Sequence, residues 1–291
     1  MSRPASAVQL RGLSGEMSAV EPPVDVVVAI PAHNEQRLIR RCLESVMISA
    51  GHATHSGAAR RILIAAAAHR CTDRTADEAL TCLAGYPGPF MVTRDQHSTT
   101  VGAVRARLLT DVVERHTLQP LSWVLNTDAD SEVPPTWIDE LLTRASASDH
   151  PTAIAGLVEL SGWSPSQGAR RRYTDIIDAG IHAGTHDHVY GANLGVRWDA
   201  YQAVGGFHAV EHGEDHDLIE RLRHQNLAVA TTFTPRVRTS GRTPGRAEHG
   251  LGALLARLED VSGSHRPHAT HSANDHLTNK NPVAALPATG D

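Results

Sequence analysis

The chain of 291 residues is poor in aromatic residues, cysteine and long apolar runs. No segment approaches the roughly 20 apolar residues that cross a bilayer, so no integral membrane span is expected. Cys42, Cys71 and Cys82 are odd in number and form no Cys-x-x-Cys pair, which favours reduced thiols. Residues 1–22 lack a continuous apolar stretch and predict no secretory signal. Together these absences predict a cytoplasmic protein.

The chain also lacks an excess of basic residues, with 27 Lys and Arg against 32 Asp and Glu and a formal net charge of -5. A nucleic-acid partner is therefore not expected. Two terminal stretches, residues 1–23 and 261–291, are small or polar and aperiodic, and we predict that they are disordered tails. The remaining residues, 24–260, are expected to form one folded domain.

Strand and helix patterns alternate within that domain. Apolar runs predict strands at 24–30, 62–67, 90–93, 123–126, 154–160 and 191–196. Apolar residues at helical spacing predict helices at 38–47, 75–83, 101–116, 137–142, 170–183, 199–204, 214–224 and 251–258. Thr75 and Glu78 have the spacing of a capping box at the start of the second helix. Alternating strands and helices predict an α/β fold with a mostly parallel sheet.

The fourth strand is followed by two carboxylates, Asp128 and Asp130, one residue apart. Ligands of open α/β sheets bind beyond the carboxyl ends of the strands. Paired carboxylates there suit a hard cation such as Mg²⁺ or Mn²⁺, which prefers oxygen ligands. Ordinary turn chemistry is the alternative, because Asp tolerates turn conformations.

Other polar residues lie where neighbouring elements begin or end. Glu35 closely follows the first strand, in a loop that could equally cap the next helix. Glu214 and Asp215 open a later helix, where acidic residues also compensate the helix dipole. No Gly-x-Gly-x-x-Gly and no Walker lysine loop is present, so any phosphate must be held by a cation and by basic side chains.

These pieces, taken together and in order, resemble the family 2 glycosyltransferases with the GT-A fold. The resemblance covers roughly residues 24–258. It is carried by VAIPAHNE at 28–35, CTDRTA at 71–76, TDAD at 127–130, GAN at 191–193, GGF at 205–207 and GED at 213–215.

The resemblance implies transfer of a sugar, typically a hexose, from a nucleotide-diphospho-sugar donor to an acceptor hydroxyl. It implies a mixed, mostly parallel sheet flanked by helices. It assigns the metal to Asp128 and Asp130 and the catalytic base to Asp215, with Glu214 beside it. The residues implied to bind the nucleotide are Pro31, Ala32, Glu35, Asp73, Gly102, Arg105, Asp128 and Ala129. The cleft for donor sugar and acceptor is assigned to Gly191, Ala192, Asn193 and Arg242.

Elementary chemistry supports these roles. A divalent cation neutralises the charge that develops on a leaving diphosphate. A carboxylate on the opposite face can take the proton of the attacking hydroxyl, and one displacement inverts the anomeric centre. Residues 67–71 lack the acidic pair that many family members carry. The nucleobase of the donor is therefore not determined, and we expect UDP before GDP.

The acceptor could be a small molecule, a lipid headgroup or a peptide. Its specificity is expected in the loops 161–169 and 183–190. Four arginines near the end could form a basic loop over the diphosphate or a solvated surface loop, and Arg242 is our choice among them. These arginines are Arg236, Arg238, Arg242 and Arg246.

Two other classes of function stay open at this point. A nucleotide-sugar-binding protein without turnover would have no need of the base at Asp215. A zinc hydrolase could be built on one of two histidine groups. These groups are His182, His186 and His188, and His208, His212 and His216. Separately, His249 could be an additional ligand of the metal in the glycosyltransferase interpretation.

Overall fold

The computed structural model describes residues 24–243 and 250–263. The two tails predicted to be disordered therefore lie almost entirely outside the described residues, as do Arg246 and His249. The last helix, α8 (Leu251–Gly263), runs past the expected end of the folded domain at residue 260.

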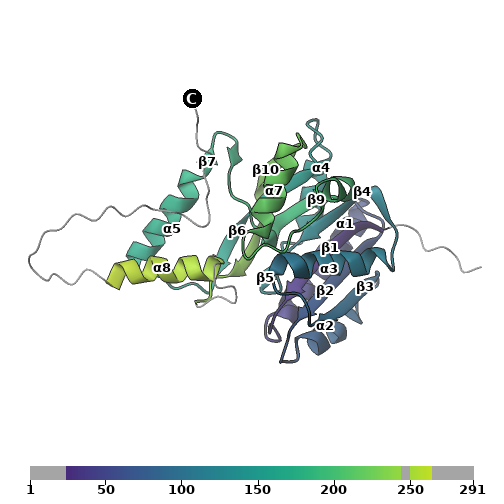
Figure 1. Cartoon of the computed structure of the whole chain (residues 1–291), viewed down its shortest axis with the longest axis horizontal. Coiled ribbons are helices and arrows are strands. Elements are labelled where there is room, and N and C mark those ends of the chain that lie inside the picture. The colour runs from purple at the N-terminus through teal and green to yellow at the C-terminus, as the bar shows by residue number, and fades with distance from the viewer. Residues whose placement is uncertain (1–23, 244–249, 264–291) are drawn as a thin grey trace, which may run out of the picture.

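In the described part of the chain, eight strands form one sheet in the order β3-β2-β1-β4-β9-β6-β10-β5 (Figure 1). The strands are β1 (Val24–Ala32), β2 (Ile62–His69), β3 (Phe90–Asp95), β4 (Leu118–Asn126), β5 (Ser131–Glu132), β6 (Ala153–Ser161), β9 (Leu194–Arg197) and β10 (Val229–Ser240). Adjacent pairs among β3, β2, β1 and β4 are parallel, and so is the pair β6–β10. Only β9 and β5 run against their neighbours. The predicted mixed, mostly parallel sheet is confirmed.

Helices cover both faces of the sheet. The covering helices are α1 (Ile39–Ser56), α2 (Thr75–Leu83), α3 (Val101–Val113), α4 (Trp137–Ala145), α6 (Trp198–Ala203) and α7 (Glu214–His224), while α5 (Gln167–Ala179) lies apart from these layers. Alternate residues of β1 point to opposite layers: Val26 and Val28 pack with α1, α2 and α4, while Val27 and Ala29 pack with α3, α6 and α7. Because both faces of β1 are buried, its sequence is a continuous apolar run.

Two helices pack together beside the sheet. α5 and α8 lie side by side, away from the two main layers (Figure 1). A small cluster of Ala169, Leu254 and Leu258 joins them, with Trp163 and Tyr173 packed against it. The short strands β7 (Ile181–His182) and β8 (Thr185–His186) form a separate hairpin after α5.

The structure differs from the sequence-based expectation at several elements. β10 was not predicted. The strand expected at 191–196 begins with a single 3-10 turn, η1 (Gly191–Asn193), before β9. The capping box at Thr75 does not form, because Thr75 lies inside α2 and its hydroxyl instead accepts a hydrogen bond from the Glu35 backbone N–H (2.8 Å).

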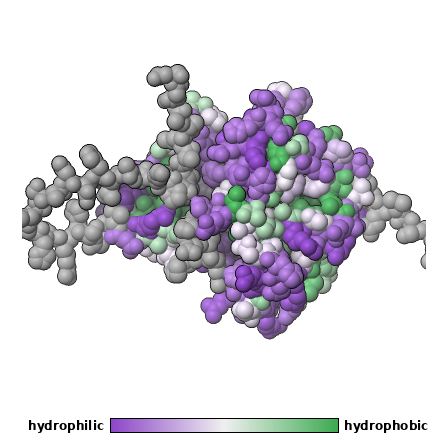
Figure 2. Space-filling view, in the orientation of Figure 1, coloured by the Kyte–Doolittle hydropathy of each residue, from purple (hydrophilic) through white to green (hydrophobic). Residues whose placement is uncertain are grey.

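None of the helices in the described residues has the length and apolar character of a membrane span. The face shown in Figure 2 is largely hydrophilic, with apolar residues in small separate groups.

Candidate active site

The polar residues singled out by the sequence converge at one edge of the sheet. The carboxyl ends of β1, β4 and β10 meet there, together with η1 at the start of the antiparallel strand β9. The first turns of α3 and α7 approach the same edge, because Arg105 of α3 contacts Asp128 after β4 and Glu214 of α7. Segments more than a hundred residues apart thus form one site.

Arg105 is the central cation of this site, although its side chain is only 1% exposed. Its guanidinium donates hydrogen bonds to Asn126 Oδ1 (3.2 Å), Asp128 Oδ1 (2.7 Å) and the Gly191 carbonyl (3.3 Å). Its Nε lies 3.4 Å from a carboxylate oxygen of Glu214. A buried charge is tolerated only when it is paired in this way, so Arg105 fixes the positions of these four groups.

The start of α3 explains how Arg105 reaches the site. The Thr100 hydroxyl caps the helix by accepting the Ala103 N–H (3.2 Å). At Gly102 an added Cβ would lie 2.0 Å from the His208 carbonyl oxygen. Only glycine allows this close approach, and the first turn of α3 is thereby pressed against the segment that leads to α7.

Asp215 and Glu214 open α7 beside this arginine. Asp215 Oδ2 accepts a hydrogen bond from the Gly191 N–H (2.7 Å), which fixes the carboxylate against η1. Burial, reinforced by the negative charge of Asp215, raises the pKa of Glu214 to about 7. Gly213, with φ of 74°, makes the left-handed turn that starts the helix here.

A second pair of carboxylates consists of Glu35, which follows β1, and Asp130, which follows β4. Arg242, which follows β10, donates a hydrogen bond to Glu35 Oε2 (2.8 Å) and contacts the second Glu35 oxygen as well. The same guanidinium lies 3.1 Å from Asp130 Oδ2. Arg242 therefore bridges the end of β1 to the acidic residue that follows β4.

The site carries more negative charge than its arginines balance. Burial raises the pKa of Asp130 to about 7, and the neighbouring Asp128 charge adds to this rise. Burial also raises the pKa of Asp128, which Arg105 opposes. Two partly desolvated carboxylates whose negative charges oppose each other fit a divalent cation, because a cation relieves both effects.

Comparison with known proteins gives the family. Residues 27–194 match the family model described as Glycosyl transferase family 2. The chain belongs to this family. The match covers the segment from β1 to the start of β9, which includes Asp128, Asp130 and Gly191. The chain is thus an enzyme, a glycosyltransferase, and the resemblance inferred from its motifs is confirmed.

Solved structures confirm the GT-A fold of this glycosyltransferase. The mannosyltransferase PcManGT from Pyrobaculum calidifontis, in complex with GDP-Man and Mn²⁺, has a TM-score of 0.58 and 14% sequence identity. TarS 1–349 of S. aureus in complex with UDP has a TM-score of 0.54 and 12% identity. Glucosyl-3-phosphoglycerate synthase from Mycobacterium tuberculosis, in complex with phosphoglyceric acid, has a TM-score of 0.50 and 14% identity.

The matches cover 86%, 81% and 81% of this chain, and 66%, 65% and 80% of PcManGT, TarS 1–349 and the synthase, respectively. The glycosyltransferase thus spans about two thirds of the length of the first two. At these identities the likeness shows the fold alone. The search of curated proteins gives no match.

The nucleotide-binding residues predicted for the glycosyltransferase lie at the same edge. Pro31 and Ala32 end β1, and Glu35 follows them. Asp73 ties two loops together, since its carboxylate accepts hydrogen bonds from the backbone of Thr75 (3.0 Å) and Gln36 (3.2 Å).

Two of the small residues in the predicted set point away from the edge. The side chains of Ala32 and Ala129 belong to the apolar core of the α1 layer. Any contact of these two residues with a ligand therefore runs through the backbone.

Asn193, which was expected to shape the cleft, occupies a buried position behind it. Its side chain is fully buried and accepts a hydrogen bond from the Trp137 indole N–H (2.9 Å). It donates to the carbonyls of Leu157 and Pro235, both at 2.8 Å. With these bonds Asn193 ties η1 to α4, β6 and β10, so it holds the cleft in shape instead of lining it. Neighbouring Ala192 is buried as well.

The histidines contact separate partners. His186 and His188 donate to the carbonyls of Thr232 (3.1 Å) and Ile177 (2.8 Å). His182 pairs with Asp187 (2.7 Å). The described residues contain no group of three or more His, Cys, Asp or Glu side chains placed to hold a metal ion. A cation at Asp128 and Asp130 thus needs ligands from substrate phosphates and water, as Mg²⁺ commonly does.

Proposed function

We propose that this enzyme is a metal-dependent, inverting glycosyltransferase that moves a hexose from a nucleotide-diphospho-sugar to an acceptor hydroxyl. The observation that carries the proposal is that Asp128 and Asp215 converge beside Arg105, while Asp130, two residues after Asp128, is paired with Arg242. Asp128 pairs directly with the Arg105 guanidinium, and Asp215 is bonded to the same η1 turn whose carbonyl the guanidinium contacts.

The diphosphate side of the site has the chemistry that a leaving nucleotide needs. Mg²⁺ or Mn²⁺ held by Asp128 and Asp130 would supply a positive charge to neutralise the departing diphosphate. Arg242 carries a planar guanidinium able to bind a phosphate in bidentate fashion. It must first release Glu35, to which both of its terminal nitrogens are bonded, and Asp130, with which it is paired at 3.1 Å.

The acceptor side depends on Asp215. The Asp215 carboxylate is held at both oxygens, Oδ2 by the Gly191 N–H and Oδ1 by the His216 N–H (2.8 Å), so it keeps a fixed orientation. A remaining lone pair of the carboxylate can take the acceptor proton. Burial raises the pKa of the neighbouring Glu214 to about 7, so Glu214 is partly protonated near neutral pH. Attack from the side opposite the diphosphate inverts the anomeric carbon.

Ligands bound in structurally similar proteins support such a donor. One contains GDP-Man with Mn²⁺ and another contains UDP. Uridine and guanosine donors should therefore both be tested, UDP-sugars first.

The cysteines Cys42, Cys71 and Cys82 are free thiols, in keeping with our expectation of a cytoplasmic enzyme.

The test is Asp215→Asn, compared with Glu220→Gln as a matched change of an exposed acid on the same helix. We expect Asp215→Asn to lower transfer by about 10²–10⁴-fold, because proton removal is lost. Binding of UDP or GDP with Mn²⁺ should persist in both variants, measured by calorimetry. Unchanged transfer in Asp215→Asn would show that the base lies elsewhere. Nucleotide binding without any transfer or donor hydrolysis in the wild type would favour the binding protein without turnover.

A further inference from the structure

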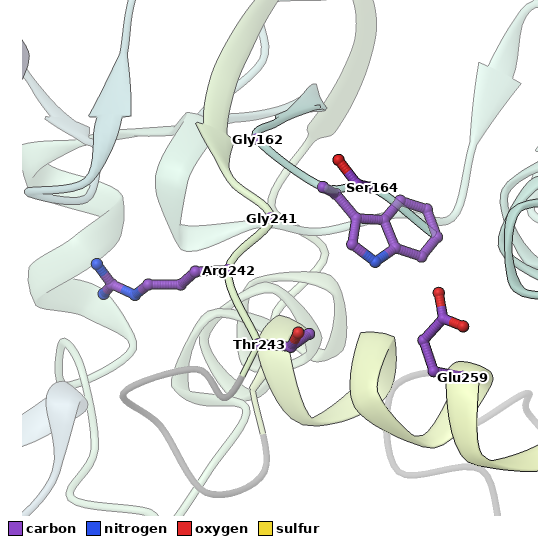
Figure 3. Close-up of a pocket in the computed structure, with 7 residues that line it drawn as sticks. Gly162, Ser164, Gly241, Arg242, Thr243 and Glu259 are labelled. Atoms are coloured by element: carbon purple, nitrogen blue, oxygen red, sulfur yellow. The ribbon is translucent and has the colours of Figure 1, made fainter. Parts of the chain in front are cut away.

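A pocket of about 410 Å³ lies directly beside Arg242 (Figure 3). Three segments form its walls: the chain that follows β6, the chain that follows β10, and α8. They contribute Trp163 and Ser164, Gly241 and Thr243, and Glu259, respectively. Gly162, Trp163 and Ser164 belong to the loop 161–169, which is one of the two loops in which acceptor specificity is expected.

Trp163 is fixed in this pocket by its surroundings. Its ring contacts Tyr173 of α5 edge to face, with 5.2 Å between the ring centroids, and packs on the cluster that joins α5 to α8. The backbone of Gly241 approaches so closely that an added Cβ would lie 2.4 Å from the Trp163 Cβ. A half-buried, preorganised indole offers an aromatic surface to a ligand at little entropic cost.

The two charged side chains of the pocket wall, Glu259 and Arg242, both have hydrogen-bonding partners. Glu259 accepts a hydrogen bond from the Ser166 N–H (2.8 Å). Arg242 lines the pocket with its stem, but its guanidinium points away from Glu259 (Figure 3). The guanidinium is paired with Glu35 and Asp130. A wall with one carboxylate and no available guanidinium repels an anion. Hydroxyl groups, by contrast, find partners in Glu259, Ser164 and Thr243.

The pocket connects to both halves of the reaction. Arg242, which lines the pocket, lies 3.1 Å from Asp130. Through Tyr173 the pocket approaches Tyr190, whose pKa is raised by burial and then by the charges of Tyr173 and Asp215. Tyr190 immediately precedes Gly191, whose N–H holds Asp215. The pocket therefore adjoins Arg242 on the side of the proposed cation site, and Tyr173 on the side of the segment that holds the proposed base.

We propose that this pocket binds a neutral sugar ring of a carbohydrate acceptor, with the ring's C–H face on Trp163 and its hydroxyls on Glu259, Ser164 and Thr243. This inference rests on the proposed function and names the acceptor class for it. A ring of this kind combines an apolar face with hydroxyl donors and acceptors, which matches the mixed lining of the pocket.

The test is saturation-transfer difference NMR on the full chain with UDP or GDP and diamagnetic Mg²⁺. The probes are the methyl α- and β-glycosides of glucose, mannose and galactose, with glycerol 3-phosphate and tetramethylammonium as anionic and cationic comparisons. We expect transfer to the C–H protons of at least one glycoside and none to the two charged probes. Trp163→Ala should weaken glycoside binding about threefold to tenfold, the range of one aromatic contact.

Trp163→Phe keeps an aromatic face and the packing on Tyr173, so it should retain most of the binding if the alanine variant fails to fold. Glu259→Gln should weaken binding while leaving the nucleotide affinity unchanged. Glycoside binding that is equal in the wild type and a folded Trp163→Ala, or charged probes that bind in place of glycosides, would overturn the inference. If the nucleotide binds and no glycoside does, this inference alone fails. If the nucleotide does not bind, the proposed function fails, and glycosides titrated without nucleotide still test the pocket.

Discussion

Replacing Arg242 with Gln should change the affinities for metal and for donor in opposite directions. In the structure the guanidinium of Arg242 occupies the space beside Asp130 where a cation is proposed to bind, at 3.1 Å from the carboxylate. Metal binding to the free enzyme must therefore displace this ion pair. Removing the arginine frees Asp130 and also removes a positive charge that repels the metal.

The expected size follows from the burial of the pair. The side chains of Arg242 and Asp130 are 28% and 17% exposed, so solvent screens them only in part. Two unit charges about 4 Å apart interact by about 4 kcal/mol at an effective dielectric constant of 20, and desolvation offsets much of this. We take about 1–2 kcal/mol as the net gain, which corresponds to about 5- to 30-fold tighter Mn²⁺ binding in Arg242→Gln. Donor binding should weaken about tenfold or more, because a charge-assisted hydrogen bond to the diphosphate is lost.

The assay is Mn²⁺ titration followed by electron paramagnetic resonance, first without and then with a nucleoside diphosphate. Arg238→Gln is the matched control, since Arg238 lies on β10 with its side chain 55% exposed and pairs with Glu159 at 3.7 Å. The control should change neither affinity. Weaker Mn²⁺ binding in Arg242→Gln, or changes of equal size in both variants, would refute the reasoning.

Two further predictions concern pH and packing. The pKa of Asp130 is raised to about 7 in the folded metal-free protein, whereas the unfolded chain releases this proton near pH 4. The free energy of unfolding should therefore fall as pH rises from about 4 to 7. Thermal melts should show this fall, and a less steep one in Asp130→Asn. Mn²⁺ affinity should rise over the same range up to pH 7 and then level off; a flat profile in calorimetry would contradict this. Gly102→Ala should lower the free energy of unfolding by about 1–3 kcal/mol, since the new Cβ meets the His208 carbonyl oxygen at 2.0 Å. Gly51→Ala, inside α1 with nothing within 4 Å, should instead raise it by about 0.5–1 kcal/mol, and equal effects of the two changes would contradict the packing argument.

Local sequence patterns were sufficient for the first half of the fold. The strands around residues 24–30 and 62–67 are buried on both faces, so they appear as apolar runs regardless of their partners. The Asp128 and Asp130 pair was found because it directly follows such a run. Both predictions depend on residues adjacent in the sequence.

Features fixed by distant partners could not be predicted. β10 is rich in threonine and interrupted by Pro235, and it is a strand because it pairs with β6 along most of its length. The helical spacing of α3 did not reveal that Arg105 is buried among Asn126, Asp128 and Glu214.

The same limit explains one wrong assignment. The Thr75 hydroxyl was expected to cap its own helix, and instead it accepts the N–H of Glu35. A tertiary hydrogen bond thus prevailed over the local pattern. Asn193 was expected to shape the cleft, but its motif did not reveal the bond to Trp137, which lies 56 residues away in sequence.

The most direct test of the central claim is calorimetric binding of UDP and GDP with and without Mn²⁺, in the wild type and in Asp130→Asn. If a cation on Asp128 and Asp130 bridges the protein to the diphosphate, Mn²⁺ should tighten the binding of one nucleotide at least about tenfold, the equivalent of one charge-assisted contact. That dependence should disappear in Asp130→Asn. Nucleotide binding that is equally tight without Mn²⁺ in the wild type would contradict the account.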